Sequence, residues 1–140
     1  MLPQVSAPIK RRGLLAGLAG IVGGLATART TSTRAAVAPS APILLLESHV
    51  AGTAYYDADR LLNSLTLGQT LILRRQPGNR HDDLAIEVIV PVSGKLGYIP
   101  RVHNQPLARL MDAGKTLRAE VLHLSPGKWE KVWLQVWMAG

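Results

Sequence analysis

Between residue 43 and the end of the chain, apolar residues recur in six short stretches separated by turn-forming glycine and proline residues. The first stretch, 43–50, is a nearly continuous apolar run, which is typical of a buried strand. The stretches near residues 70, 84 and 117 alternate between apolar and polar positions, as half-buried strands do. The predicted strands are residues 43–50, 70–75, 84–90, 95–99, 117–123 and 129–138.

Two other stretches have the apolar spacing of helices. Asp57 can cap a short helix, and Gly68 is expected to end it. Its apolar residues are Ala58, Leu61, Leu62 and Leu65. In the second stretch Pro106 suits a first helical turn, and Gly114 is placed to end the helix. Six strands and two helices in about 98 residues predict a mostly-β domain, a small closed barrel plugged by helices.

The last predicted strand has two unlike faces. The aliphatic face, which belongs in the core, is Val132, Leu134, Val136 and Met138. The other face carries Trp129, Trp133 and Trp137 between Lys131 and Gln135. Either the helices and the loop around Tyr55 and Tyr56 cover these rings, or part of the face stays open for bases to stack. Trp129, near the start of the strand, is the best candidate for exposure.

The first 42 residues differ in kind from the rest. Lys10, Arg11 and Arg12 precede a Gly- and Ala-rich, mildly apolar stretch, and this pattern is typical of an export signal. The arginine pair favours a twin-arginine signal over an ordinary secretory one. We therefore predict a signal-like segment at 1–26, a linker at 27–42 and a folded domain at 43–140. The protein is exported or periplasmic if the signal is used and cytoplasmic otherwise, without a stable membrane span in the mature chain.

Composition narrows the possible functions. The net charge of +7 is carried mostly by the first 42 residues, which hold five basic residues and no acid, so it is weak evidence for nucleic acid. The chain has no cysteine, which excludes thiolate chemistry and disulfides. The four histidines are scattered without metal-ligand spacing, and no nucleotide loop or nucleophile motif is present. We expect no metal, no cofactor and no enzymatic activity.

Three segments in fixed order resemble the HIRAN domain. They are the G-x-x-Y-Y segment at 50–56, the N-x-x-D-x-x-A-I-x-V segment at 76–88 and the G-Y-I-P-R segment at 95–101. A later helix-like segment, 107–114, also fits. The resemblance covers nearly all of 43–140 and implies an OB-like six-stranded barrel.

The resemblance also implies a site that binds the 3′ end of single-stranded DNA. Tyr55 matches an aromatic residue that stacks on the terminal base, with Tyr56 beside it, and Asp82 matches a carboxylate that accepts a hydrogen bond from the 3′-hydroxyl. The other implied contacts are Asn79 and His81 in the same loop, Arg101 at a phosphate and Trp129 as an aromatic wall. Ala54 departs from the pattern, because the DNA-binding relative has an arginine there, and one lost phosphate contact lowers affinity.

Each of these residues also has a purely structural interpretation. Asn79 and Asp82 could organise a tight turn, and the two tyrosines could be core aromatics. The sequence therefore predicts a non-catalytic module that binds single-stranded DNA ends. Two alternatives stay open: an exported module that uses the same cleft for another ligand, and one that uses it for a protein partner.

Overall fold

The computed structural model describes residues 38–56 and 58–140. The strands are β1 (Ile43–His49), β2 (Thr70–Arg75), β3 (Ile86–Val90), β4 (Gly94–Tyr98), β5 (Leu117–Leu124) and β6 (Val132–Met138). The helices are the 3₁₀ turn η1 (Thr53–Tyr55), α1 (Ala58–Leu62) and α2 (Arg101–Asp112). All six predicted strands and both predicted helices are present. The expected signal segment and most of the linker lie outside the described residues, as does the expected cap Asp57.

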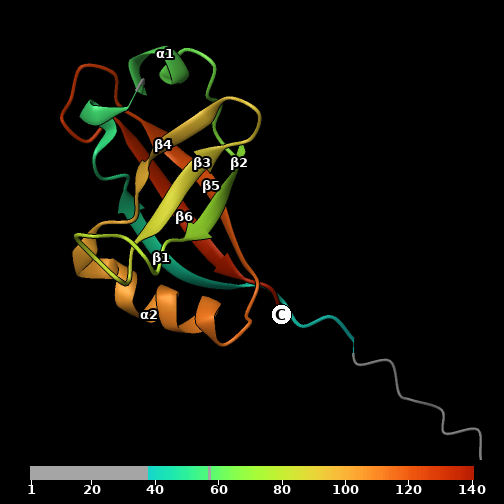
Figure 1. Ribbon diagram of the computed structural model, residues 1–140. Helices are drawn as coiled ribbons and strands as arrows, with labels where there is room; N and C mark the ends of the chain where they lie inside the picture. The colour runs from blue at the N-terminus through green and yellow to red at the C-terminus, as the bar shows by residue number, and fades with distance from the viewer. Residues whose placement is uncertain (1–37, 57) are drawn as a thin grey trace, which may run out of the picture. The chain divides into compact units, whose positions relative to one another are not determined.

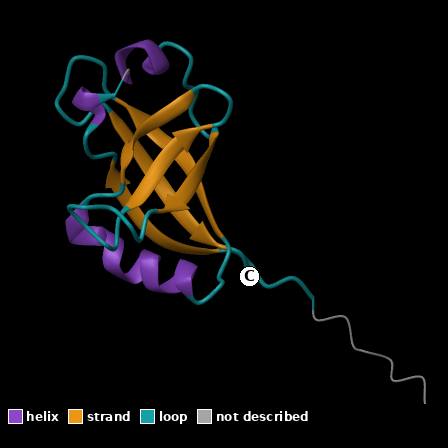
Figure 2. Ribbon diagram, viewed as in Figure 1, coloured by secondary structure: helices purple, strands orange, loops and turns teal. Residues whose placement is uncertain are grey.

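The strands form one antiparallel sheet in the order β1-β6-β5-β2-β3-β4. The sheet folds back on itself, so that β2, β3 and β4 cross in front of β1, β5 and β6 (Figure 1). Buried side chains from both halves, such as Val88 in β3 and Leu134 in β6, belong to a single apolar cluster. Helix α2 lies across one end of the sheet, and η1 and α1 lie at the other end (Figure 2).

A closed barrel is not confirmed. In the described part of the chain, β1 and β4 are the edge strands, and they do not pair along their length. One bridge links the chain just after β1 to the end of β4: the Ala51 amide donates to the Tyr98 carbonyl at 2.8 Å, and the Tyr98 amide donates to the Ala51 carbonyl at 2.9 Å. Gly97 makes this approach possible, because a Cβ there would lie 2.2 Å from the Ala51 carbonyl oxygen.

The alternation of β3 and β6 places the predicted faces correctly. Ile86, Val88 and Val90 are buried, as is the aliphatic face formed by Val132, Leu134 and Val136. These side chains cannot leave the core without a one-residue slip of the strand, which would expose the whole face. The sequence pattern therefore fixes the register of the two strands that build most of the core.

Four predicted boundaries are wrong for local reasons. Helix α1 ends at Leu62 and not at Gly68, because the Ser64 amide and hydroxyl both donate to the Leu61 carbonyl and turn the chain.

Two strands begin later than predicted. The strand predicted from residue 84 begins at Ile86, because side-chain hydrogen bonds hold residues 79–84 in a turn. The strand predicted from Trp129 begins at Val132, because the Ser125 amide bonds back to the Lys131 carbonyl and closes a loop.

The fourth wrong boundary is at α2. Pro106 was expected in the first turn, but Pro100 precedes the first residue of α2 and Pro106 lies inside the helix. Pro106 has no amide hydrogen, so α2 lacks one of its backbone hydrogen bonds and is helical in spite of that loss. Gly114, with φ of 79°, ends the helix as predicted.

Candidate functional site

A pocket of about 340 Å³ lies where the bridge between Ala51 and Tyr98 meets the β2–β3 loop. We call it the Asp82 pocket. It is lined by Ala51, Gly52, Tyr56, Asn79, His81, Asp82, Ala85, Tyr98, Ile99 and Arg101. Five of the seven residues predicted from the sequence therefore meet here, although they come from three separate segments of the chain.

Asn79 holds the β2–β3 loop in shape. Its side-chain oxygen accepts hydrogen bonds from the amides of His81 (2.9 Å) and Asp82 (3.2 Å). Its side-chain amide donates to Gln76 Oε1 at 3.0 Å. Asn79 thus organises the turn, as the structural interpretation of this residue suggested, and the same turn sets the positions of His81 and Asp82 at the pocket.

The Asp82 carboxylate is fixed from two sides. Oδ1 accepts a hydrogen bond from the Leu84 amide at 3.0 Å, and Oδ2 accepts one from Asn104 Nδ2 at 2.6 Å. An ionised carboxylate has about four acceptor sites, so two such bonds leave capacity for a further donor. A ligand hydroxyl at the pocket can therefore donate to a carboxylate that is already held in place.

Asn104 was missed by the sequence analysis. It lies on α2, is 1% exposed, and shares the buried face of that helix with Leu107 and Ala108. The sequence does contain a signal for the burial of Asn104. Leu107 and Ala108 follow it by three and four residues, so all three lie on the same face of a helix. That signal shows burial but not the partner, which comes from a loop 22 residues earlier.

Tyr98 is a second lining residue that was not predicted as part of the site. Its hydroxyl donates to Gln76 Oε1 at 3.0 Å, and it accepts a hydrogen bond from Lys95 Nζ. Gln76 Oε1 also accepts from Asn79, so one amide oxygen joins β4 to the β2–β3 loop. The loop that carries Asp82 is therefore fastened both to α2 and to the sheet.

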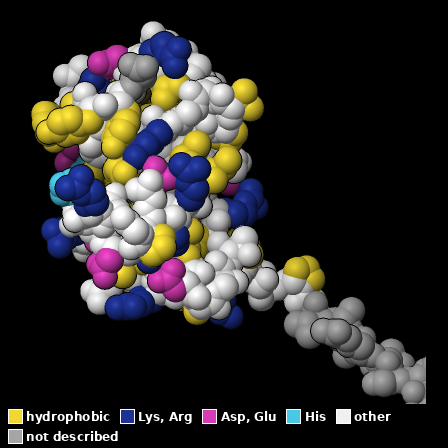
Figure 3. Space-filling model, viewed as in Figure 1, with side chains coloured by type: hydrophobic (Ala, Val, Ile, Leu, Met, Phe, Trp, Pro, Cys, Tyr) yellow, Lys and Arg dark blue, Asp and Glu magenta, His cyan; other side chains and the backbone are white. Residues whose placement is uncertain are grey.

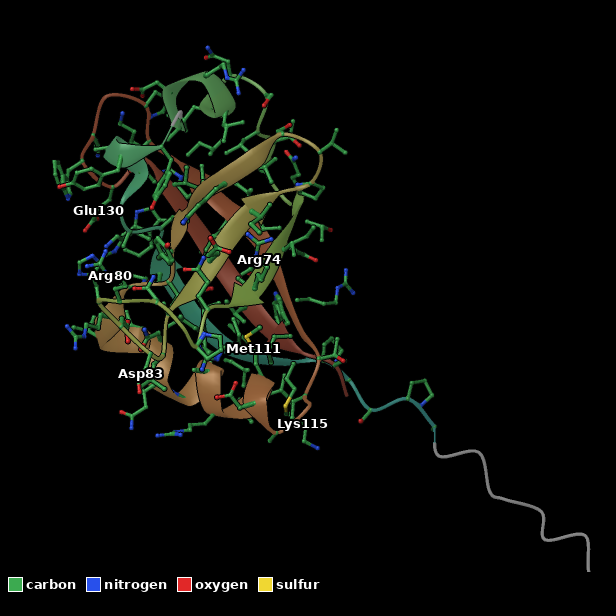
Figure 4. The ribbon with its side chains drawn as sticks, viewed as in Figure 1. Arg74, Arg80, Asp83, Met111, Lys115 and Glu130 are labelled. Atoms are coloured by element: carbon green, nitrogen blue, oxygen red, sulfur yellow. The ribbon has the colours of Figure 1, made fainter. Side chains whose placement is uncertain are left out.

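A charged cluster lies beside the pocket. Glu87 on β3 is buried, with its carboxylate 2.6 Å from Arg74 Nε and 2.9 Å from Lys95 Nζ. Figure 3 shows basic side chains on either side of an acidic one over the centre of this face, and Figure 4 places Arg74 there. Two cations against one carboxylate leave one net positive charge in the cluster.

The pKa of Glu87 predicts how stability depends on acid. Burial alone would raise the pKa of Glu87, but hydrogen bonds from Arg74 and Lys95 outweigh it and the net pKa is lowered. Because the folded pKa is below the unfolded value of about 4.3, the stabilisation is complete above that pH and is lost as the pH falls through the folded pKa. We expect Glu87→Gln to lower the melting temperature at pH 7 and to flatten its fall below pH 4.

The control for this experiment is Glu47→Gln, which removes an exposed carboxylate from β1. Thermal melts followed by circular dichroism between pH 2.5 and 7 compare both variants with the unmodified chain. Some acid sensitivity should survive in Glu87→Gln, because a hydrogen bond from Arg75 also lowers the pKa of Asp112. A Glu87→Gln profile as steep as that of the Glu47→Gln variant would contradict the assignment.

Tyr55 and Trp129 lie outside the Asp82 pocket. Tyr55 is 85% exposed on η1, and it lines a separate cleft with Arg60, Ser93 and Lys95. Trp129 is 81% exposed in the β5–β6 loop, beside a depression that also includes His123 and Lys128. Tyr55 and Trp129 thus line two different hollows, whereas Tyr56 lines the Asp82 pocket.

Trp133 and Trp137 are half-buried on β6, and the Trp133 ring packs edge-on against His49 with the ring centroids 5.8 Å apart. Of the three tryptophans, Trp129 is therefore the exposed one, as the sequence predicts. Within the described residues no three histidine or acidic side chains converge as metal ligands. No helix among them is long and apolar enough to cross a membrane.

The fold and the pocket define the class of protein: a small, mostly-β domain with a pocket where the two edges of its sheet meet. The HIRAN domain matches residues 43–139, so the chain belongs to the HIRAN domain family. The resemblance seen in the sequence is confirmed. None of the curated proteins compared matches the chain.

Two solved structures are similar to the chain. A protein from Lactobacillus plantarum is 38% identical, with a TM-score of 0.65, over 71% of this chain and 96% of that one. The HIRAN domain of human HLTF is 22% identical, with a TM-score of 0.58, over 71% of this chain and 79% of that one. The bacterial protein supports the family assignment, and the human domain supports the fold.

Proposed function

We propose that the domain is a nucleic-acid-binding module that holds the free 3′-hydroxyl end of single-stranded DNA in the Asp82 pocket. Membership of the HIRAN family, whose domains bind DNA, supports nucleic acid as the ligand class. The observation that carries the finer assignment is the Asp82 carboxylate, which Asn104 and Leu84 hold at the pocket with acceptor capacity to spare.

The surrounding residues suit a terminal nucleotide. Tyr56 and His81 offer flat rings for stacking on a base, and Arg101 offers a cation for a phosphate. A carboxylate accepts a hydrogen bond from a hydroxyl but repels a phosphate, so Asp82 would discriminate between two kinds of 3′ end. The domain binds without catalysing a reaction in this proposal.

The experiment measures fluorescence anisotropy of a labelled ten-nucleotide strand with the full chain at low salt. One strand ends in a 3′-hydroxyl and the other in a 3′-phosphate. The basic N-terminal residues attract the 3′-phosphate strand slightly more, because it carries additional negative charge, so tighter binding of the hydroxyl strand cannot come from them. We expect the hydroxyl end to bind at least tenfold more tightly, since a hydrogen bond to a charged group contributes about 1.5–3 kcal/mol. Equal binding, or none, would contradict the proposal.

We propose further that residues 1–26 are an export signal of the twin-arginine type. The basic triplet Lys10-Arg11-Arg12 before a mildly apolar stretch supports this. Cell fractionation should find the chain outside the cytoplasm, and the double substitution Arg11→Lys, Arg12→Lys should retain it inside. A chain that stays in the cytoplasm with residues 1–24 intact would leave the domain to act on intracellular nucleic acid.

A further inference from the structure

A hollow of about 510 Å³ lies beside the β5–β6 loop, at the end of the sheet that carries η1 and α1 (Figure 1). We call it the Trp129 cleft. It shares no lining residue with the Asp82 pocket, so it is a separate feature of the surface. The proposed binding of a DNA end uses none of its side chains. The lining consists of His123, Ser125, Lys128, Trp129, Glu130 and Trp133.

Two indole rings supply the apolar part of the cleft. Trp129 is exposed, so its ring is open to a ligand. Trp133 is half-buried, and its ring packs edge-on against His49, which fixes its position. A large aromatic ring that is exposed beside a fixed one offers a broad apolar surface with no partner in the described part of the chain. A ligand with an apolar face can pack there.

The loop that carries Trp129 has a defined shape. The Lys128 amide donates to the Ser125 carbonyl at 3.2 Å, and Pro126 and Gly127 lie between them. Gly127 has a φ of 82°, as the second central residue of a type II turn requires. The Ser125 amide donates to the Lys131 carbonyl at 2.7 Å and closes the loop. The aromatic and polar sides of the cleft are therefore in place before a ligand binds, which lowers the entropic cost of binding.

The polar side chains of the cleft offer both donors and acceptors. Ser125 Oγ lies 2.8 Å from His123 Nε2. Whichever of these two atoms donates in that hydrogen bond, the pair keeps one further donor and one further acceptor. The Glu130 carboxylate is about half exposed, and its Oε1 lies 3.7 Å from Nδ1 of His49, the residue that packs against Trp133. Ligand hydroxyls can therefore donate to Glu130 and both donate to and accept from the Ser125–His123 pair.

Charge narrows the class of ligand. The lining contains one lysine and one glutamate. A nucleic-acid phosphate attracted by Lys128 would be repelled by Glu130, and an organic cation attracted by the two rings would be repelled by Lys128. A neutral ligand with several hydroxyls avoids both repulsions. A sugar ring has this character, because hydroxyls surround its edge and C–H groups on its faces can pack on the negative face of an aromatic ring.

We propose that the Trp129 cleft binds a neutral saccharide. One sugar ring stacks on Trp129, Trp133 forms the wall beside it, and the hydroxyls bond to Glu130 and to the Ser125–His123 pair. This site is independent of the Asp82 pocket. The domain therefore has two binding sites for ligands of different chemistry, one for a charged strand end and one for a neutral sugar.

The test follows the indole N–H signals of the isotope-labelled full chain by NMR. Cellotetraose, maltotetraose and the tetramer of N-acetylglucosamine are each added to about 10 mM, because contacts at an open surface give weak affinity. Trp137 is an internal control, since it lies on the same strand as Trp133 but does not line the cleft. We expect at least one saccharide to shift the signals of Trp129 and Trp133 and to leave that of Trp137 unchanged.

Two variants test whether the cleft itself binds the saccharide. Trp129→Ala should weaken binding by at least about tenfold, because a tryptophan that a ligand covers contributes much of the binding energy. Tyr55→Ala is the matched control, because it removes an equally exposed aromatic ring that does not line the cleft, and it should change the affinity by less than about twofold. Melting temperatures check that both variants fold. Equal losses in the two variants would overturn the site.

Salt and a competing ligand test the charge argument. Binding of a neutral saccharide should not change between about 50 and 500 mM salt, whereas binding of DNA falls steeply. If an oligothymidylate shifts the Trp129 signal at low salt and no saccharide does, the cleft binds nucleic acid and the proposal is wrong. If no saccharide shifts Trp129 or Trp133, the proposal also fails, while binding of a DNA end in the Asp82 pocket is unaffected.

Discussion

Asp82→Asn is expected to abolish the preference for a 3′-hydroxyl end. Asparagine has the shape of aspartate and keeps an oxygen that can accept from the Leu84 amide. Its new NH₂ group replaces the oxygen that accepts from Asn104, and the Asn104 amide can turn over so that its own oxygen accepts instead, so the loop should fold as before. The substitution removes the charge that receives the terminal hydroxyl. A charge-assisted hydrogen bond contributes about 1.5–3 kcal/mol, which corresponds to about a 10- to 100-fold loss of affinity for the hydroxyl end. Affinity for the 3′-phosphate end should rise, because its repulsion is relieved.

Asp83→Asn is the matched control for this experiment. Asp83 is the next residue, is exposed, and does not line the Asp82 pocket, yet its substitution changes the net charge by the same amount (Figure 4). Any general electrostatic gain for DNA should appear equally in both variants. Fluorescence anisotropy gives the affinity of each variant for strands with a 3′-hydroxyl and with a 3′-phosphate. A general electrostatic gain raises both affinities, whereas loss of discrimination changes their ratio. If Asp82→Asn and Asp83→Asn behave alike, Asp82 serves only to shape the turn.

The regular elements could be predicted where apolar and polar side chains alternate along a strand. Burial of Val132, Leu134 and Val136 on one side of β6 is a direct consequence of alternation, and this signal is strong in the sequence. The predicted ends of these elements were wrong where side chains form hydrogen bonds with the backbone in place of regular structure. Asn79 and Asp82 hold a turn where an extended strand was expected, and no apolar pattern records that competition.

The site was predictable only in part, for a related reason. Tyr56, Asp82 and Arg101 could be predicted as site residues because each lies in a short segment that matches a family motif. Asn104 and Lys95 act through partners that are distant in the sequence, on the β2–β3 loop and on β3. Such pairings depend on how the sheet folds back on itself. The same limit explains Tyr55, which shares a separate cleft with Tyr56 but, unlike Tyr56, does not line the Asp82 pocket.

Closure of the sheet edges at Gly97 should be essential for both the fold and the site. Two backbone hydrogen bonds join Ala51 to Tyr98, and both residues line the Asp82 pocket. A methyl group at residue 97 would lie 2.2 Å from the Ala51 carbonyl oxygen and 2.8 Å from Val50 Cγ1. Neither neighbour is the end of a flexible side chain, so the two edges must separate.

Gly97→Ala is therefore expected to destabilise the domain by about 3 kcal/mol, the upper end of the cost of overpacking, and to lower its melting temperature by roughly 10–20 °C. Gly78→Ala is the matched control: it makes the same change in the β2–β3 loop, where an added Cβ would meet nothing within 4 Å. Thermal unfolding by calorimetry measures both. At a temperature where Gly97→Ala is still folded, DNA-end binding should also be weaker than in Gly78→Ala, because opening the edges moves Tyr98 and Ala51 apart. Equal melting temperatures for the two variants would show that the edges tolerate separation and that the bridge does not hold the pocket together.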